Sequence, residues 1–321
     1  MQQKLTDFLI PAYEQTNTRV TVQSFVEEQQ LYTNWFSVEY EGWKLPATAE
    51  PHYWCGEWQR RGCLNAENHR KLGFGNNIFV RQYRRSCYRP TCKVCYHQWI
   101  IRQSNRATRR IEKYAKMFGR EPFHLMLSVP LADYSSSYNE LKKKLNCIIK
   151  DLGVYGSAVV FHPFRLRRPN RKQHYYSPHF HLVCFGEISG RVSYIGKKYG
   201  WYVKYLKTRD SVFKTFCYLL SHSGIKKGYR SMTWIGSLSY GKLKLEKEPD
   251  LNICPCCRVK LVEIYRDVFD PVIPPGKYYE GFVDPGGWYE VKPMVFDSNY
   301  RYDYAPIMHL NEILRGISIA S

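Results

Sequence analysis

The sequence predicts an α+β fold in which an antiparallel sheet carries helices on one face. Two features support this prediction. Between residues 119 and 250, short apolar segments typical of strands occur in βαββα order with amphipathic helical segments. Close groups of cysteines on both sides of this region predict appended zinc-binding modules, because clustered thiols in an intracellular chain favour metal ligation over disulfides.

Composition and charge indicate the kind of partner. The 321 residues are 44% hydrophobic, enough for one large or two small domains with a core. Lys and Arg number 48 against 28 Asp and Glu, and the resulting charge of +20 attracts polyanions through counterion release. The 27 tyrosines offer faces on which unstacked bases can lie. We therefore expect single-stranded nucleic acid as the partner, with a ribosomal or scaffold protein as the plainer alternative.

Neither a membrane span nor a secretory signal is evident in the chain. Crossing a bilayer takes an apolar run of about 18 residues, and the sequence has none. The polar N-terminus lacks the charged-then-apolar order of a secretory signal. We expect a cytoplasmic protein with no membrane partner.

The extreme N-terminus, residues 1–10, resembles a peptide that binds a sliding clamp. Four residues fit the pattern Q-x-x-L-x-x-F-[aromatic or aliphatic]: Gln2, Leu5, Phe8 and Leu9. One helical turn puts Leu5 and Phe8 on the same side as a plug for an apolar pocket, and Gln2 supplies hydrogen bonds. A terminal helix that packs on its own core is the alternative. Residues 11–50 show no clear period and are expected to be a connector.

Residues 51–118 contain the first cysteine region. Cys92 and Cys95 have the C-x-x-C spacing of a zinc knuckle. Three further thiols lie close enough in sequence to complete a tetrahedral site: Cys55, Cys63 and Cys87. His69 and His97 are additional candidate ligands. We expect a structural Zn²⁺ here, because a closed four-ligand site leaves no position for catalysis; ordinary buried thiols are the alternative.

A second knuckle occurs at residues 251–269, where Cys254 and Cys257 repeat the same spacing and Cys256 is a possible substitute ligand. No second cysteine pair lies near it in the sequence. We therefore predict that this knuckle meets Cys55 and Cys63 across the fold and binds a second structural Zn²⁺.

The remaining elements follow from periodicity. The segment after Cys95 combines helical spacing with many arginines, and predicts a long basic helix that either grips phosphate or exposes a solvated face. Five core elements follow along the chain: strand 123–129, helix 141–152, strand 156–162, strand 179–185 and helix 210–222.

The strand "HFHLVCF" carries two histidines on one face. His179 and His181 are about 6.6 Å apart by the strand rise, near enough to bind one cation. Two histidines that merely pack in the sheet are the alternative. If 156–162 pairs antiparallel with 179–185, His162 lies at the same sheet end as His179. His162 is then a candidate third ligand, although it can equally be structural.

The helix at 210–222 separates an apolar stripe from Tyr218, which lies opposite, beside Thr215 and His222. A tyrosine off the core stripe, with a histidine one turn later, is arranged to present its hydroxyl group. A surface tyrosine without a function is the alternative.

Together these segments resemble the HUH endonucleases, specifically the rolling-circle replication initiators carried by archaeal plasmids and viruses. The resemblance rests on "HLMLSVP", "VVFHPFR", "SPHFHLVCFG", the tyrosine in "FCYLLSH" and the knuckle "CYRPTCKVCYHQW". It implies a βαββαβ core of the HUH type, similar to that of RNA-recognition motifs. It also implies that His179 and His181 hold Mn²⁺ or Mg²⁺, and that Tyr218 attacks the scissile phosphate of single-stranded DNA.

Elementary chemistry agrees with these roles. A divalent ion neutralises the charge that builds on the phosphate oxygens, and tyrosine attack leaves a 5′-phosphotyrosine and a 3′-OH that primes synthesis. One departure is that many bacterial relatives carry a lysine three residues after the tyrosine, where this chain has Ser221 followed by His222. Either His222 replaces the lysine as a catalytic group, or the nucleophile lies elsewhere.

We therefore predict an enzyme that nicks and joins single-stranded origin DNA. The sequence contains no P-loop, so a host helicase and polymerase are expected partners beside the clamp. A single-tyrosine HUH transposase is the alternative enzyme, and a noncatalytic zinc-ribbon DNA-binding protein or transcription regulator is the alternative from another class. The tail, residues 270–321, contains "VIPPGKYYEGFVDPGGWYEV", which predicts a turn-linked β-hairpin.

Overall fold

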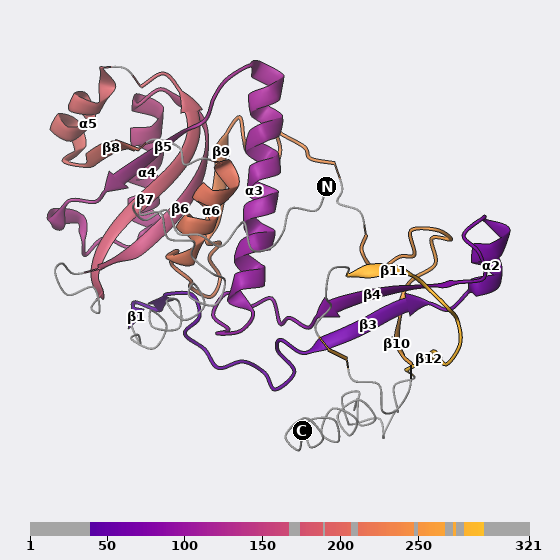
Figure 1. Ribbon diagram of the computed structural model, residues 1–321. Helices are drawn as coiled ribbons and strands as arrows, with labels where there is room; N and C mark the ends of the chain where they lie inside the picture. The colour runs from indigo at the N-terminus through magenta and orange to yellow at the C-terminus, as the bar shows by residue number, and fades with distance from the viewer. Residues whose placement is uncertain are drawn as a thin grey trace, which may run out of the picture. The chain divides into compact units, whose positions relative to one another are not determined.

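The computed structural model divides the chain into two compact units (Figure 1). Unit 1 comprises residues 1–53 and 87–246, and unit 2 comprises residues 54–86 and 247–321. The region 51–118 therefore contributes to both units. The structure describes these residues: 39–166, 174–188, 190–206, 211–246, 250–266, 272–273 and 279–291. The clamp-binding pattern lies outside them, and none of the helices within them has the length and apolar character needed to cross a bilayer.

Unit 1 is built on a five-stranded sheet in the order β8-β5-β7-β6-β9, in which every neighbouring pair is antiparallel. Its strands are β5 (Phe123–Ser128), β6 (Val154–Leu166), β7 (His174–Gly186), β8 (Tyr202–Leu206) and β9 (Met232–Gly236). Two helices connect the first four of these strands: α4 (Tyr138–Asp151) and α5 (Arg191–Tyr199). Each helix joins two strands that have another strand between them, so two split βαβ units interleave. The prediction of an α+β fold with an antiparallel sheet is confirmed.

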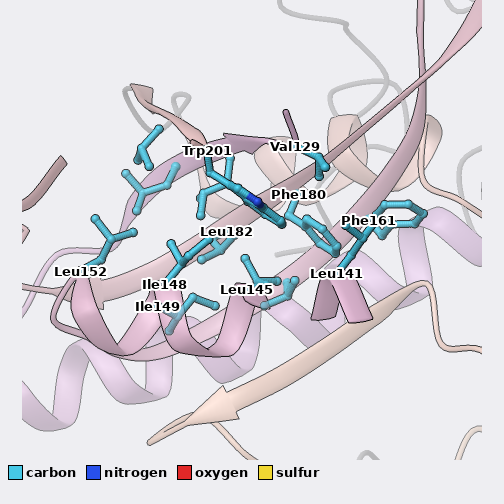
Figure 2. Close-up of a cluster of buried hydrophobic side chains, with 14 of the residues drawn as sticks. Val129, Leu141, Leu145, Ile148, Ile149, Leu152, Phe161, Phe180, Leu182 and Trp201 are labelled. Atoms are coloured by element: carbon cyan, nitrogen blue, oxygen red, sulfur yellow. The ribbon is translucent and has the colours of Figure 1, made fainter. Parts of the chain in front are cut away.

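One face of this sheet packs against α4 and α5, as Figure 2 shows for the α4 side chains. α4 begins with a capping box in which the Glu140 carboxylate accepts a hydrogen bond from the Ser137 N–H at 2.8 Å. The main buried contacts come from α4 and from alternate residues of β7: Leu141, Leu145, Ile148, Phe180, Leu182 and Cys184. This layer forms the larger core of unit 1.

The opposite face packs against α3 (Tyr96–Phe118) and α6 (Val212–Ser221). Buried residues from both helices and the sheet meet there: Ala107, Ile111, Val160, Val183, Phe185, Phe216 and Leu219. The prediction of helices on one face is therefore wrong. Sequence neighbours such as Leu182 and Val183 are both apolar and point to opposite faces, so that both faces need a covering layer.

Three short elements complete unit 1: the pair β1 (Glu39–Tyr40) and β2 (Trp43–Lys44), and the 3₁₀ turn η2 (Leu131–Asp133). Trp43 is 3% exposed and belongs to the α4-side core. Its ring lies 4.9 Å from the ring of Phe161 on β6. The last residues of the predicted connector are therefore part of the folded unit.

Unit 2 has a second five-stranded sheet, in the order β11-β4-β3-β10-β12. Its elements are β3 (Trp58–Cys63), α2 (Ala66–Lys71), β4 (Ile78–Arg84), β10 (Val262–Tyr265), β11 (Glu280–Val283) and β12 (Tyr289–Glu290). The predicted β-hairpin is wrong, because β11 pairs with β4 and β12 pairs with β10. When β11 pairs with β4, the ring centroid of Phe282 lies 5.5 Å from that of Phe79 and 5.1 Å from that of Phe74. Both residues of β12 are exposed, so pairing with β12 would provide no such buried contact.

Candidate functional site

Three histidines from β6 and β7 come together in unit 1. His162 pairs directly with His179 across the two strands, which confirms the predicted register. His181 follows on the same face of β7. The candidate ligand nitrogens of the three residues all lie within 4.8 Å of one another, and no side chain is more than 6% exposed. The structure thus brings the predicted ligand pair and the predicted third ligand to one point.

Backbone carbonyl groups select the tautomers of two of these imidazoles. The Nε2–H of His162 donates to the Leu219 carbonyl oxygen at 2.7 Å, and the Nδ1–H of His179 donates to that of Ser177 at 2.9 Å. A carbonyl oxygen only accepts, so each ring carries its proton on the bonded nitrogen. The lone pairs therefore lie on Nδ1 of His162 and Nε2 of His179, which are the atoms available to a metal ion.

His124, which was not among the predicted site residues, orients the third imidazole. It lies on β5, opposite Val183, and its Nε2 is 2.9 Å from Nδ1 of His181. When Nδ1 of His181 donates this hydrogen bond, Nε2 of His181 carries the lone pair. Outer partners of this kind are typical of metal-binding histidines. The sequence predicts the strand that holds His124, but only the sheet order shows that this strand adjoins β7.

Burial keeps the three imidazoles neutral at physiological pH. It lowers the pKa of His179 to about 3, and the positive charge of Arg165 contributes further. The pKa values of His162 and His181 also lie well below the ordinary histidine value, first because of burial and then because of neighbouring histidines. Only a neutral imidazole binds a metal, so this set is ready for an ion at neutral pH.

The donor set carries no negative charge. Within the described residues the cluster contains three imidazoles and no carboxylate. Glu187, the carboxylate closest to His181 in the sequence, accepts a hydrogen bond from the Tyr155 hydroxyl at 2.8 Å and pairs with Arg120 at 3.4 Å. Imidazole suits transition-metal ions, whereas Mg²⁺ prefers oxygen ligands. The three nitrogens can therefore hold a divalent transition-metal ion and leave coordination positions for other ligands.

α6 carries the predicted nucleophile next to this cluster. Tyr218 is 37% exposed, whereas its neighbour Leu219 is fully buried and supplies the carbonyl that orients His162. The ring of His222, the residue that caps the end of α6, lies 5.3 Å from the ring of Tyr218 and 6.4 Å from that of His162. One turn of helix thus connects the tyrosine, His222 and the histidine cluster.

Ser221 determines which nitrogen of His222 is basic. The Ser221 hydroxyl donates to the Tyr218 carbonyl oxygen at 2.8 Å and lies 2.7 Å from Nδ1 of His222. Because its single hydrogen is used, Ser221 accepts from the Nδ1–H of His222. Nδ1 also approaches the Tyr218 carbonyl oxygen at 3.3 Å, which agrees with a protonated Nδ1. Nε2 of His222 is therefore the nitrogen that can accept a proton.

A second candidate metal centre lies within unit 2. Its ligand atoms, all within 4.8 Å of one another, come from Cys63, His69, Cys254 and Cys257. Nε2 of His69 is 3.4 Å from the Cys254 sulfur and 3.5 Å from the Cys257 sulfur. The Nδ1–H of His69 donates to the Asn77 carbonyl oxygen at 2.7 Å, which leaves Nε2 to face the thiols. Three sulfurs and one nitrogen fit a closed tetrahedral zinc site.

Ionisation of the thiols in this group is uneven. Burial opposes ionisation of Cys257, yet a hydrogen bond from the Val259 backbone, followed by interactions with His69, Cys63 and Cys254, lowers its pKa to about 7. Burial raises the pKa of Cys63 to about 12 in the metal-free protein. Cys257 therefore ionises more readily than an ordinary thiol, and Cys63 less readily. A metal ion that binds there must displace the proton of Cys63.

A third group, within unit 1, consists of thiols that also lie within 4.8 Å of one another: Cys87, Cys92 and Cys95. Cys92 and Cys95 directly precede α3, and the N–H of Cys95 donates to the Cys92 sulfur at 3.4 Å. The predicted knuckle is therefore joined by Cys87, one of the three further thiols that the sequence offered. The predicted grouping of Cys55 with the Cys254 knuckle is wrong.

His69 takes the place that was predicted for Cys55. α2 follows β3 directly and turns His69 inward, where the side chain is fully buried beside Cys63 and Cys254. His97 and Cys256, which were also considered as ligands, belong to none of these groups. Local helix geometry, rather than cysteine spacing, selects the fourth ligand.

Comparisons of the chain with protein-family models, with curated proteins and with solved structures found no match.

The three-histidine cluster predicts a graded loss of metal binding. Replacing His162, His179 or His181 by Ala should abolish Mn²⁺ binding in calorimetric titrations, because each supplies a ligand. His124→Gln should weaken Mn²⁺ binding by about 10- to 100-fold, because His124 only orients a ligand. His97→Ala is the control and should bind Mn²⁺ like the wild type. Undiminished Mn²⁺ affinity in the His179 and His181 variants would contradict the assignment.

The same burial predicts that stability depends on pH. Unfolded histidine takes up a proton near pH 6.5, whereas folded His179, with a pKa of about 3, does not. The unfolded state then binds more protons, so the free energy of unfolding falls as the pH drops below about 6.5. The slope approaches about 1.4 kcal/mol per pH unit for each such histidine. Urea denaturation between pH 7.5 and 5.5, without added Mn²⁺, should give a shallower slope for His179→Asn than for the wild type. Equal slopes would refute this prediction.

The two cysteine-containing groups predict zinc stoichiometry. We expect two Zn²⁺ ions per chain, and one in Cys63→Ser or His69→Ala, measured by elemental analysis. Loss of the ion should also unfold unit 2, because metal binding supplies folding free energy. Cys147→Ser, which alters an exposed thiol outside both groups, should keep both ions. Two ions in the Cys63 and His69 variants would disprove the assignment.

Proposed function

We propose that this protein is a metal-dependent enzyme of the HUH type that nicks and rejoins single-stranded DNA and starts rolling-circle replication at an origin. The observation that carries the proposal is that one turn of α6 couples Tyr218 and His222 to the buried histidines, through the Leu219 carbonyl and His162. A purely structural histidine cluster would not need a tyrosine and a second proton acceptor beside it.

In the proposed reaction, Oη of Tyr218 attacks the phosphorus of a phosphodiester as the bond to the 3′ oxygen breaks. The phenolic proton passes to Nε2 of His222, and the departing 3′ oxygen takes up a proton to become a 3′-OH. The other strand end stays attached to the protein as a 5′-phosphotyrosine, so the reverse attack can rejoin the strand. Phenols ionise only near pH 10 in solution, which is why a neighbouring base is needed.

The three histidines would hold the catalytic ion through Nδ1 of His162 and Nε2 of His179 and His181. When bound, a divalent ion neutralises charge on the nonbridging phosphate oxygens and fixes the ester for attack. Of the two ions that the resemblance implies, the all-nitrogen donor set favours Mn²⁺ over Mg²⁺. Preference for Mn²⁺ is therefore part of the proposal.

The sheet topology supports the HUH-type core. The order β8-β5-β7-β6 is the order of strands 4, 1, 3 and 2 in a βαββαβ fold, with β9 added at one edge. The strand with both histidines is then central, flanked by β5 with His124 and β6 with His162. Both neighbours of the histidine strand thus contribute to the proposed ion site.

The remaining partners belong to the same proposal. The net charge of +20 and the exposed tyrosines favour single-stranded origin DNA, and the zinc groups would shape the surface that binds it. A sliding clamp bound through residues 1–10, and a host helicase and polymerase, would place the reaction at a replication fork in the cytoplasm. A single-tyrosine HUH transposase would use the same residues on a different DNA.

The proposal predicts a covalent adduct. Incubating the protein with single-stranded origin DNA and Mn²⁺ should give a protein–DNA band that survives denaturing electrophoresis. Tyr218→Phe should abolish the band while DNA binding persists, and His222→Ala should slow its formation by about 100-fold or more, because a general base is lost. Tyr240→Phe removes another exposed tyrosine and is the matched control.

An adduct that persists in Tyr218→Phe would move the nucleophile to another residue. If no origin sequence gives an adduct although DNA binds tightly, the noncatalytic zinc-containing DNA-binding protein becomes the better interpretation.

A further inference from the structure

Arg165 lies beside the histidine cluster and has no role in the chemistry described so far. It lies near the end of β6, and its Nη2 donates a hydrogen bond to the Ser128 hydroxyl at 2.7 Å. Ser128 is the last residue of β5 and pairs directly with His179 on β7. A side chain from β6 therefore reaches across β7 to β5 at the position of a metal ligand.

The guanidinium is not fully satisfied by these contacts. Its Nε is buried and makes no hydrogen bond with any residue that the structure describes. A buried donor without a partner is costly, and for a charged group the cost is larger. Arginine presents several N–H groups in a planar fork that matches the oxygens of a phosphate. Arg165 is only half-buried, so part of its side chain is in contact with solvent.

The charges around Arg165 favour an anion. Its guanidinium donates to Ser128, the residue that pairs with His179, so its positive charge lies at the strand position of a ligand. Three neutral imidazoles leave the charge of a bound divalent ion unbalanced, and Arg165 adds a further positive charge. Among the described residues the cluster holds no carboxylate that compensates. An ordinary metal centre would not place a fixed cation beside the ion unless an anionic ligand joined them.

We propose that Arg165 is a substrate-binding residue whose guanidinium, positioned by Ser128, holds the DNA phosphate that binds at the three-histidine centre. This inference rests on the proposed function, and it adds a specific contact: Nε and a terminal nitrogen of Arg165 donate to phosphate oxygens on the His179 side of the centre. The contact selects a phosphodiester over a neutral ligand and aligns the ester for Tyr218.

The test compares two affinities in a background that cannot react. In Tyr218→Phe protein saturated with Mn²⁺, Arg165→Gln should weaken the binding of single-stranded DNA by about tenfold or more, because charge-assisted hydrogen bonds are lost. Mn²⁺ affinity without DNA should stay equal or rise, because a repelling charge is removed. If Arg165 only stabilises the fold, Arg165→Gln should weaken both DNA binding and Mn²⁺ binding. If Arg165 has no role, the substitution should change neither affinity.

Three further variants control for charge and for folding. Arg165→Lys should recover only part of the DNA affinity, because a point charge cannot form a bidentate contact. Ser128→Ala keeps the charge but releases the guanidinium, and should cause a smaller loss. Lys150→Gln removes an exposed positive charge on α4, at the opposite face of the sheet, and should leave DNA affinity unchanged. The slope of log affinity against log salt should fall by about 0.7 in Arg165→Gln only.

Failure of this inference is separable from failure of the proposed function. Suppose that the wild-type protein forms the covalent adduct, and that Arg165→Gln in the Tyr218→Phe background binds DNA and Mn²⁺ as tightly as Tyr218→Phe alone. The role of Arg165 is then refuted, and the proposed nicking activity is supported. If Arg165→Gln loses DNA affinity with Mn²⁺ affinity intact while the wild type forms no adduct, the phosphate contact stands and the nicking activity is refuted.

Discussion

The register between β6 and β7 is the constraint on which the candidate centre depends. It sets His162 opposite His179, and the period of two along β7 then brings His181 to the same face. A slip of one residue would turn His162 toward the α4 side, where Phe161 now packs, and leave only two imidazoles together. A slip would also exchange Phe161 and Val160 between two layers that are packed around side chains of different size. The same packing that stabilises unit 1 therefore also aligns the ligands.

Electrostatics connects this geometry to the proposed chemistry. Sites that rely on carboxylates hold a divalent ion by compensating its charge, whereas this cluster offers only neutral nitrogens, with Arg165 beside them. Such a centre binds its ion less firmly by charge and retains more positive potential for an anion. In the proposed reaction, a phosphodiester would supply the missing negative charge. The buried carbonyl oxygens of Leu219 and Ser177 orient the imidazoles of His162 and His179, so that their lone pairs point to one position.

Periodicity explains which features were predictable from the sequence. The long amphipathic helix α3, the stripe of α6 and the alternating histidines of β7 are local patterns, and the structure has them. The covering of both sheet faces was missed because the strand pattern shows that residues are apolar but not which layer meets them. His124 became visible only once the sheet order was known, because α4 and β6 separate β5 from β7 along the chain. Arg165 lies on β6, the hairpin partner of β7, but only its hydrogen bond to Ser128 on β5 places its side chain beside the cluster. His69 likewise follows from the turn of α2 and not from cysteine spacing. The roles of Tyr218 and the ion stay predictions.

The most direct test of the central claim is electron–nuclear double resonance on Mn²⁺ bound to Tyr218→Phe protein, with and without single-stranded DNA. The account predicts hyperfine couplings to histidine nitrogens, which change on ¹⁵N-histidine labelling and are lost in His179→Ala. It also predicts a ³¹P coupling that appears when DNA is added, because a backbone phosphate joins the ion. A Mn²⁺ spectrum that shows neither histidine nitrogen nor phosphorus couplings would contradict the claim that these buried histidines form a phosphate-binding metal centre.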